Sequence, residues 1–143
     1  MFASRFIVFF LSFVLTSVLA APINSRAAVK LNVANCTARN VKLNTHDCDV
    51  ALLGLGGGIA GKIQFLRVNA ASTTAVSGTC RVTATAVNGG TTIDISKGRL
   101  EGHGSSNGGF DNLRDACGTT PGSMIIGGGS NNGGDIEIAI SKA

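Results

Sequence analysis

The chain contains no tryptophan and no tyrosine among its 143 residues, and only 14% of its residues are charged. Five of its seven phenylalanines fall in the first twenty residues, which leaves only Phe65 and Phe110 beyond them. Two phenylalanines cannot form a base-stacking platform, and the Lys and Arg residues form no cluster that would neutralise a phosphate backbone. The sequence therefore predicts no nucleic-acid partner. Because Trp and Tyr are absent, any carbohydrate site must work through hydrogen bonds rather than through stacking on these rings.

The only long apolar run lies at the N-terminus. Arg5 precedes the apolar stretch 6–19, and Val18 and Ala20 occupy the third-last and last positions before a cleavage site for signal peptidase. This pattern predicts a signal peptide at residues 1–20, a loose leader at 21–28 and a single domain at 29–143. The run is short for a membrane span and no second one follows, so we expect a secreted, extracellular protein with no membrane span. Removing the signal leaves eleven basic residues against eight acidic ones.

The four cysteines predict two disulfides. An even number of cysteines in a short secreted chain usually forms disulfides, and each bridge contributes on the order of 2–4 kcal/mol. Metal binding is the weaker interpretation because the sequence has no CxxC or CxxH pair and no acidic calcium loop. We expect neither a metal site nor a cofactor. The cysteines are Cys36, Cys48, Cys80 and Cys117.

Alternating apolar and polar residues predict four main strands, at residues 29–35, 62–68, 79–87 and 135–141. Asn44 is a suitable N-cap for a helix that continues to Leu55, and a second helix follows from residue 110 to 117. The order predicts an α+β fold, a two-layer sandwich of ferredoxin-like β-α-β-β-α-β topology with two helices on one face of an antiparallel sheet. Weaker strand signals occur at 72–76, 91–96 and 124–126, and polar loops are expected at 97–109 and 127–134.

This topology also makes predictions about the cysteines and the sheet edges. With the four main strands ordered 4-1-3-2, the end of strand 29–35 lies beside the start of strand 79–87. That arrangement predicts the pairs Cys36–Cys80 and Cys48–Cys117. Strands 62–68 and 135–141 would then form the edges of the sheet, and an exposed edge would allow a homodimer.

Four segments together resemble a family of fungal proteins. They are the strand with cysteine VKLNVANC, the helix start HDCDVALLGL, the strand SGTCRVTATAV and the helix end LRDACG. The arrangement resembles the glycan-binding small secreted proteins of mushrooms and, more distantly, the killer toxins of smut viruses. The resemblance implies a lectin-like effector or defence protein whose partners are extracellular glycans, in a cell wall or on a cell surface. The alternative is a killer-toxin-like antimicrobial protein that acts at a competitor's cell surface.

Two Gly- and Asn-rich loops supply the candidate glycan-binding residues. Residues 98–109 and 127–135 lie at the same end of the predicted sandwich, where their polar groups could share one site. An alternative interpretation is that the Gly and Asn residues only form turns with positive φ. Asn35 begins the only N-glycosylation sequon, Asn35-Cys36-Thr37. The candidate glycan-binding residues are Arg99, His103, Asn107, Asn131, Asn132 and Asp135.

The set of residues suited to acid–base catalysis in this sequence is small. It is limited to His46 with Asp47, and to His103 with Glu101. Asp47 falls in the first turn of the predicted helix, where a carboxylate interacts favourably with the helix dipole. The sequence contains no nucleophile elbow and no HExxH motif. We therefore predict a protein that is not an enzyme, and a small secreted hydrolase that uses His103 is the second alternative.

Overall fold

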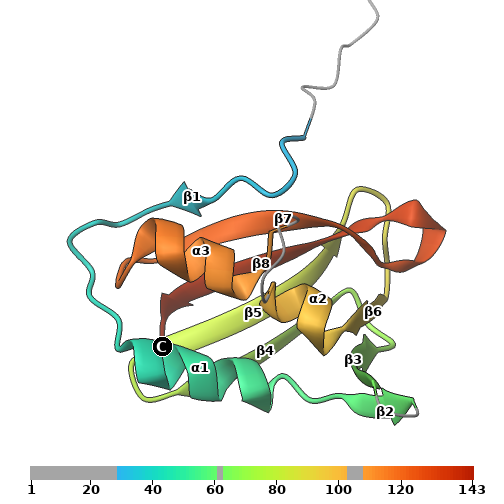
Figure 1. The fold of residues 1–143 in the computed structure, drawn as a ribbon, viewed down its shortest axis with the longest axis horizontal. Helices are drawn as coiled ribbons and strands as arrows, with labels where there is room; N and C mark the ends of the chain where they lie inside the picture. The colour runs from blue at the N-terminus through green and yellow to red at the C-terminus, as the bar shows by residue number, and fades with distance from the viewer. Residues whose placement is uncertain (1–28, 61–62, 103–107) are drawn as a thin grey trace, which may run out of the picture.

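The computed structural model describes residues 29–60, 63–102 and 108–143. The predicted signal peptide at 1–20 and the leader at 21–28 lie outside these ranges. The main sheet has five antiparallel strands in the order β1-β7-β8-β5-β4, and two helices lie against one of its faces (Figure 1). The strands are β1 (Asn35–Cys36), β4 (Ser72–Ser77), β5 (Cys80–Val87), β7 (Gly122–Gly129) and β8 (Asp135–Lys142).

A smaller sheet extends the fold beyond one end of the main sheet. It has the order β2-β3-β6, and the three strands are β2 (Gly58–Ala60), β3 (Ile63–Val68) and β6 (Ile93–Ser96). An isolated bridge between Ile93 and Ser130 links β6 to the segment that follows β7. Both sheets contribute to one hydrophobic core, because Leu66, Ile93 and Ile95 belong to the same buried cluster as the inner residues of the main sheet.

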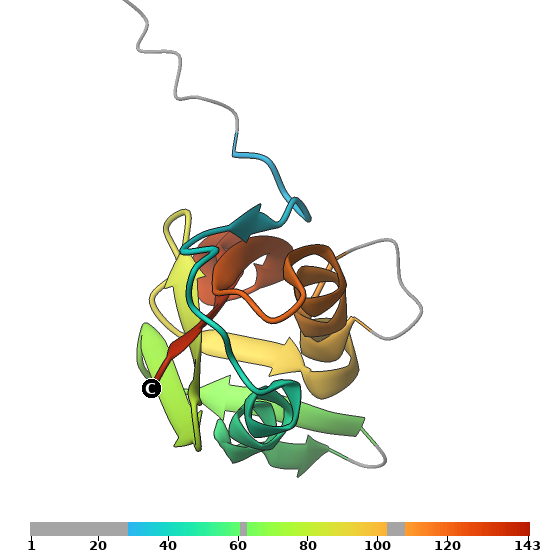
Figure 2. The same ribbon diagram turned by 90° about the vertical axis from the view of Figure 1, so that its left-hand side faces the viewer.

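Alternation along the central strands builds this core. On β5, Cys80, Val82, Ala84 and Ala86 are buried, while the residues between them face away from the helices. Ile136, Ile138 and Ile140 do the same on β8. These side chains pack under α1 (Thr45–Gly54) and α3 (Phe110–Cys117), with α2 (Lys97–Glu101) beside them. α1 contacts β4 and β5, whereas α3 contacts β7 and β1, so the two helices lie side by side (Figures 1 and 2).

The predicted α+β class, the antiparallel sheet and the helical layer on one face are confirmed. The predicted strand order is wrong. Residues 135–142 form the central strand β8, which lies between β7 and β5, and the segment 63–68 belongs to the second sheet. The hairpin β4–β5 and the strand β7 explain the difference. β4 and β7 were only weak signals in the sequence, and together with β5 and β8 they complete a sheet in which β1 is confined to one edge.

The predicted disulfide pairing is also wrong. The bridges are Cys36–Cys117, with a Cα–Cα distance of 5.3 Å, and Cys48–Cys80, with a Cα–Cα distance of 5.0 Å. Because β7 and β8 separate β1 from β5, Cys36 lies three strand spacings from Cys80, about 14 Å. A disulfide requires a Cα–Cα distance under about 7 Å. Cys36 instead meets the end of α3, and Cys48 in the first turn of α1 meets the start of β5.

Three local predictions differ from the structure as well. The pattern at 29–35 does not form a half-buried strand: Val29, Leu31 and Val33 are exposed, and Asn32 has a φ of 60°, which interrupts an extended chain. Alternation along 62–68 predicts that Phe65 faces the core, but Phe65 is only half-buried, whereas Leu66 is fully buried. The expected loop at 97–109 begins with helix α2, whose N-cap Ser96 accepts a hydrogen bond from the Arg99 amide.

Candidate functional site

A concave site lies in a groove between the helices. It encloses about 230 Å³ and is lined by residues of all three helices. We call it the interhelical groove. α1 forms one wall, α3 forms the other, and the end of α2 closes the space between them. The lining residues are Asp49, Leu52, Leu53, Glu101, Phe110, Asp111 and Arg114.

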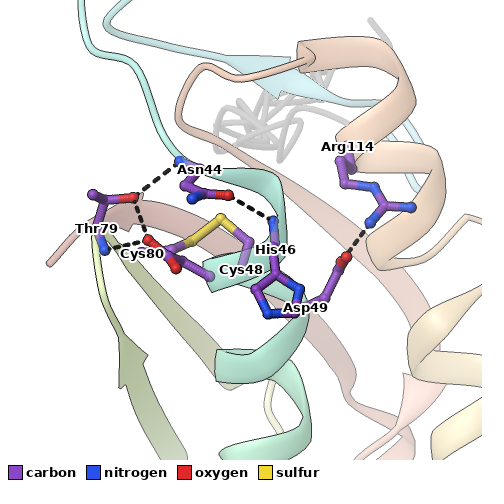
Figure 3. Close-up of a disulfide and its surroundings, with 8 residues drawn as sticks. Asn44, His46, Cys48, Asp49, Thr79, Cys80 and Arg114 are labelled. Carbon is purple, nitrogen blue, oxygen red and sulfur yellow. Dashed lines mark hydrogen bonds and ion pairs between the residues drawn. A yellow bond between two sulfur atoms is a disulfide. The ribbon is translucent and has the colours of Figure 1, made fainter.

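Arg114 organises the polar side of the interhelical groove. Its guanidinium forms an ion pair with Asp49 of α1 (Figure 3) and a second one, at 3.5 Å, with Asp111 one turn earlier on α3. The same group lies 5.7 Å from the ring centroid of Phe110, within the range of a cation–π contact. Arginine presents several donors in a planar fork, so it can hold both carboxylates at once. The contact also joins α1 to α3 across the groove.

Apolar side chains form the floor and one rim of the groove. Phe110 is 1% exposed and Leu52 is buried, whereas Leu53 is 63% exposed. Leu53 is thus an apolar surface that a ligand can cover, next to carboxylate oxygens that accept hydrogen bonds. Small-ligand sites commonly combine such an apolar wall with a few convergent polar groups. Three carboxylates, those of Asp49, Glu101 and Asp111, accompany one guanidinium, which makes the groove an acceptor-rich site.

A second hollow lies on the other side of the main sheet, under the N-terminal segment. It encloses about 370 Å³ between residues 30–35 and the strands β7 and β8. Lys30 and Glu137 are its charged residues, and exposed Val33 lies at its rim. One wall of this hollow is residues 30–34, which belong to no helix or strand. The interhelical groove has walls of regular structure and is the better candidate.

The first turn of α1 joins the helix to the turn between β4 and β5 through several hydrogen bonds. The Asp47 carboxylate accepts hydrogen bonds from the Thr79 amide, at 2.7 Å, and from the Thr79 hydroxyl, at 2.9 Å. These bonds lower the pKa of Asp47, and the bond from the amide has a larger effect than the bond from the hydroxyl. The Asn44 side-chain oxygen caps the helix by accepting a hydrogen bond from the His46 backbone amide. The backbone amide of Asn44 donates a hydrogen bond to the Thr79 hydroxyl (Figure 3). His46 is exposed, and its charge is a minor further cause of the lowered pKa of Asp47.

Three of the six predicted glycan-binding residues hold loops together. The Asn131 amide oxygen accepts hydrogen bonds from the amides of Thr91 and Thr92, at 2.7 and 3.1 Å. Asp135 accepts from the Gly128 amide at 2.8 Å and from the Asn88 side chain at 2.6 Å. Arg99 donates to the Gly127 carbonyl at 2.8 Å. These contacts favour the structural interpretation of these three residues.

The other three predicted glycan-binding residues divide into two groups. Asn132 has a φ of 54° in the turn Asn131–Gly133, the backbone role that the alternative interpretation gives to it. His103 and Asn107 lie outside the described residues. The structure brings Arg99 and Asp135 to the same stretch of β7, since both approach within 4.0 Å of the position that a Cβ on Gly127 would occupy. It places Asn131 farther along, against Thr91 and Thr92.

Asn35 of the sequon lies on β1, at the edge of the main sheet. Its side chain is exposed, and its neighbour Cys36 is bridged to Cys117. β1 pairs only with β7, where Asn35 lies opposite Ser123. An exposed side chain at a sheet edge is accessible to a glycan, and occupancy of Asn35 stays a prediction.

The sequence patterns do not predict the interhelical groove. One signal was present: Asp111 and Arg114 are three residues apart, which places them on one face of a helix. Asp49 lies one residue from Cys48 in the predicted first helix, and no pattern in the sequence singled it out. The predicted sandwich already placed two helices on one face of the sheet, but the sequence did not show that Asp49 of α1 would meet Arg114 of α3.

Two further observations bear on the chemistry. In the ranges that the structure describes, no three His, Cys, Asp or Glu side chains gather closely enough to hold a metal ion. The helices of residues 29–60, 63–102 and 108–143 are all too short to cross a membrane, the longest having ten residues.

Comparisons with the profiles of known protein families, with characterised proteins and with solved structures find no match to this chain. The resemblance to mushroom glycan-binding proteins and to killer toxins therefore stays a prediction from the sequence, and function is argued from the site alone.

Proposed function

We propose that this chain is a secreted, non-enzymatic protein that binds extracellular carbohydrate in the interhelical groove. The observation that carries the proposal is the convergence of Asp49, Asp111 and Arg114 beside the exposed Leu53. A sugar ring has an apolar face of C–H groups and a rim of hydroxyl groups. Leu53 would cover the C–H face, while the carboxylates accept bonds from the hydroxyls and the guanidinium donates to ring or hydroxyl oxygens.

The size of the groove supports a small ligand or one unit of a polymer. Sites for drug-sized molecules usually enclose roughly 300–1,000 Å³. At about 230 Å³, the interhelical groove is smaller than this range and is open to solvent along α1 and α3. A terminal or single sugar unit of a larger glycan is the ligand that this volume supports best.

The arrangement of the carboxylates supports binding rather than catalysis. Asp49 and Asp111 both form ion pairs with Arg114, so each already has a cationic partner. A general acid or base must instead exchange a proton with the substrate. In the groove these carboxylates would act as fixed hydrogen-bond acceptors. The two disulfides are in accord with secretion, because such bonds persist in oxidising surroundings.

The test is an array of immobilised glycans probed with the oxidised protein, followed by titrations with the variants Asp111→Asn and Asp115→Asn. Asp115 is the matched control, since it lies on the same helix, is exposed, and does not line the interhelical groove. We expect selective, saturable binding and a loss of about tenfold in affinity for Asp111→Asn, the scale of one hydrogen bond to a charged group. Asp115→Asn should bind as the wild type does.

Two results would contradict the proposal. Equal affinity of the wild type and Asp111→Asn for the glycan would show that the glycan does not bind in the interhelical groove. An array without any hit would reject carbohydrate binding, and growth inhibition of competitor cells by the same protein would then select the killer-toxin-like alternative.

A further inference from the structure

The free edge of β4 has a geometry that fits a second copy of this chain. β4 forms the end of the main sheet, and β5 is the only strand that pairs with it in the described ranges. The Ala86 amide donates to the Ala71 carbonyl, which fixes the phase of the β4–β5 ladder. Hydrogen-bonded pairs alternate along antiparallel strands. Ala71, Thr73 and Ala75 therefore direct their backbone groups toward β5, while Ser72, Thr74 and Val76 direct theirs outward.

Three consecutive outward residues make this edge self-complementary. Each of Ser72, Thr74 and Val76 presents one N–H and one C=O to the outside. If a second β4 approaches antiparallel with a two-fold axis at Thr74, Thr74 pairs with its own copy. Ser72 then pairs with Val76 of the other copy, and Val76 with Ser72. Every outward amide and carbonyl of the strand finds a partner in this register.

β4 lacks the devices that keep sheet edges apart. Natural edges are protected by charged side chains, prolines, bulges or short length. β4 has the sequence STTAVS, six residues without a charge or a proline, and it pairs with β5 in an unbroken register. The opposite edge differs, because β1 has only two residues.

One exposed valine lies on each face of the sheet near this edge, Val76 on the face away from the helices and Val50 on the helical face. Val76 is 54% exposed on β4, and Val50 is 42% exposed on α1. Val50 lies three residues after Asp47 and four before Gly54, so it shares a side of the helix with both. Asp47 contacts the β4–β5 turn and Gly54 lies against Ala75. Val50 therefore leans toward β4, and pairing of two edges would bring both Val50 side chains toward the seam.

We infer that β4 is a self-association surface through which two copies form one continuous antiparallel sheet of ten strands. A two-fold axis perpendicular to the sheet keeps the helices of both copies on the same side. Both interhelical grooves would then open on one face. This last consequence rests on the proposed function, since two grooves on one face would bind a polymeric glycan with avidity. The interface is small, so we expect a reversible dimer whose population depends on concentration.

The test is sedimentation velocity from about 1 μM to about 1 mM, without any glycan, on wild type, Thr74→Lys, Thr74→Glu and their equimolar mixture. The wild type should shift from monomer to dimer with concentration. Each variant alone should stay monomeric, because the two-fold register places like charges directly opposite each other. The mixture should form a heterodimer, because it places Lys against Glu.

Thr83→Lys is the matched control. Thr83 is the neighbour of Thr74 on β5 and faces the same side of the sheet, with a hydroxyl–hydroxyl distance of 3.0 Å. A lysine there adds the same charge one strand away from the edge and should leave the dimer intact. A wild type that remains monomeric throughout, a dimer that survives Thr74→Lys, or a mixture that fails to associate would each overturn the inference. None of these readings depends on glycan binding.

Discussion

At the scale of single residues, Asp47 links the helix to the sheet. Its carboxylate accepts both polar hydrogens of Thr79 in the turn that joins β4 to β5. Gly78 of the same turn has a φ of 48°, and a Cβ at that position would lie 2.3 Å from Asp47 Oδ2. The turn can therefore approach the carboxylate only because residue 78 is a glycine. Cys48 follows Asp47 in the sequence and Cys80 follows Thr79, and the disulfide between these cysteines links the helix covalently to the strand beside this contact.

This contact predicts a loss of stability in acid. Hydrogen bonds from Thr79 lower the pKa of Asp47 in the folded state below the value of about 3.9 in an unfolded chain. A lowered pKa means that the carboxylate contributes stability above about pH 4, and that this contribution disappears as the pH falls through the folded-state pKa. In Asp47→Asn, the thermal midpoint at pH 7 should fall and its dependence on pH below 4 should flatten.

The measurement is the thermal unfolding midpoint at several pH values between pH 7 and pH 2, with unfolding monitored by circular dichroism. Asp115→Asn, on α3 away from the turn, is the control and should keep the wild-type dependence on pH. An Asp47→Asn variant whose midpoint falls in acid as steeply as that of the wild type would show that Asp47 does not carry this stability.

Replacing Arg114 should affect glycan affinity much more than the stability of the fold. Its side chain is 30% exposed and that of Asp49 is 45% exposed, so solvent screens their ion pair. Such pairs contribute about 0–1 kcal/mol. Arg114→Met keeps the apolar stem against Phe110 and removes the charge. Urea unfolding should show a loss below about 1 kcal/mol, while affinity for the array-selected glycan should fall well beyond what that change explains.

At the scale of elements, the sequence predicts isolated segments better than their partners. The strands at 79–87 and 135–141 and the helices from Asn44 and Phe110 were predicted nearly within their observed bounds, because their apolar periodicity and caps are local. α2 was missed, since KGRLE is short and contains a glycine. Residues 29–34 alternate as a strand would, yet Asn32 at positive φ leaves their apolar side chains in solvent.

The disulfides test this arrangement of elements directly. Proteolytic peptides of the unreduced protein should contain Cys36 joined to Cys117 and Cys48 joined to Cys80. Peptides joining Cys36 to Cys80 would contradict the sheet order. Replacing either pair by alanine should lower the free energy of unfolding by about 2–5 kcal/mol. The model in which bridges constrain the unfolded chain predicts the larger loss for Cys36–Cys117, because it closes 81 residues rather than 32.

At the scale of the whole molecule, long-range pairing decides where the site lies. The interhelical groove exists because α1 packs over β4 and β5 while α3 packs over β7 and β1. That placement depends on β8 lying at the centre of the sheet, which periodicity along the chain does not encode. The site in the Gly- and Asn-rich loops stays a prediction, although two of its residues have structural partners far along the chain: Asn131 and Asp135 form hydrogen bonds with residues 40 and 47 positions away.

The most direct test of the account is an amide-detected NMR titration of the oxidised protein with oligosaccharides of the class selected by the array. We predict saturable chemical-shift changes that concentrate on Leu53, Asp111 and Arg114 around the interhelical groove. The residues that face away from the helices on the main sheet should keep their chemical shifts. Shifts confined to residues 127–132, or no saturable shift with any oligosaccharide, would contradict the claim that the groove binds carbohydrate.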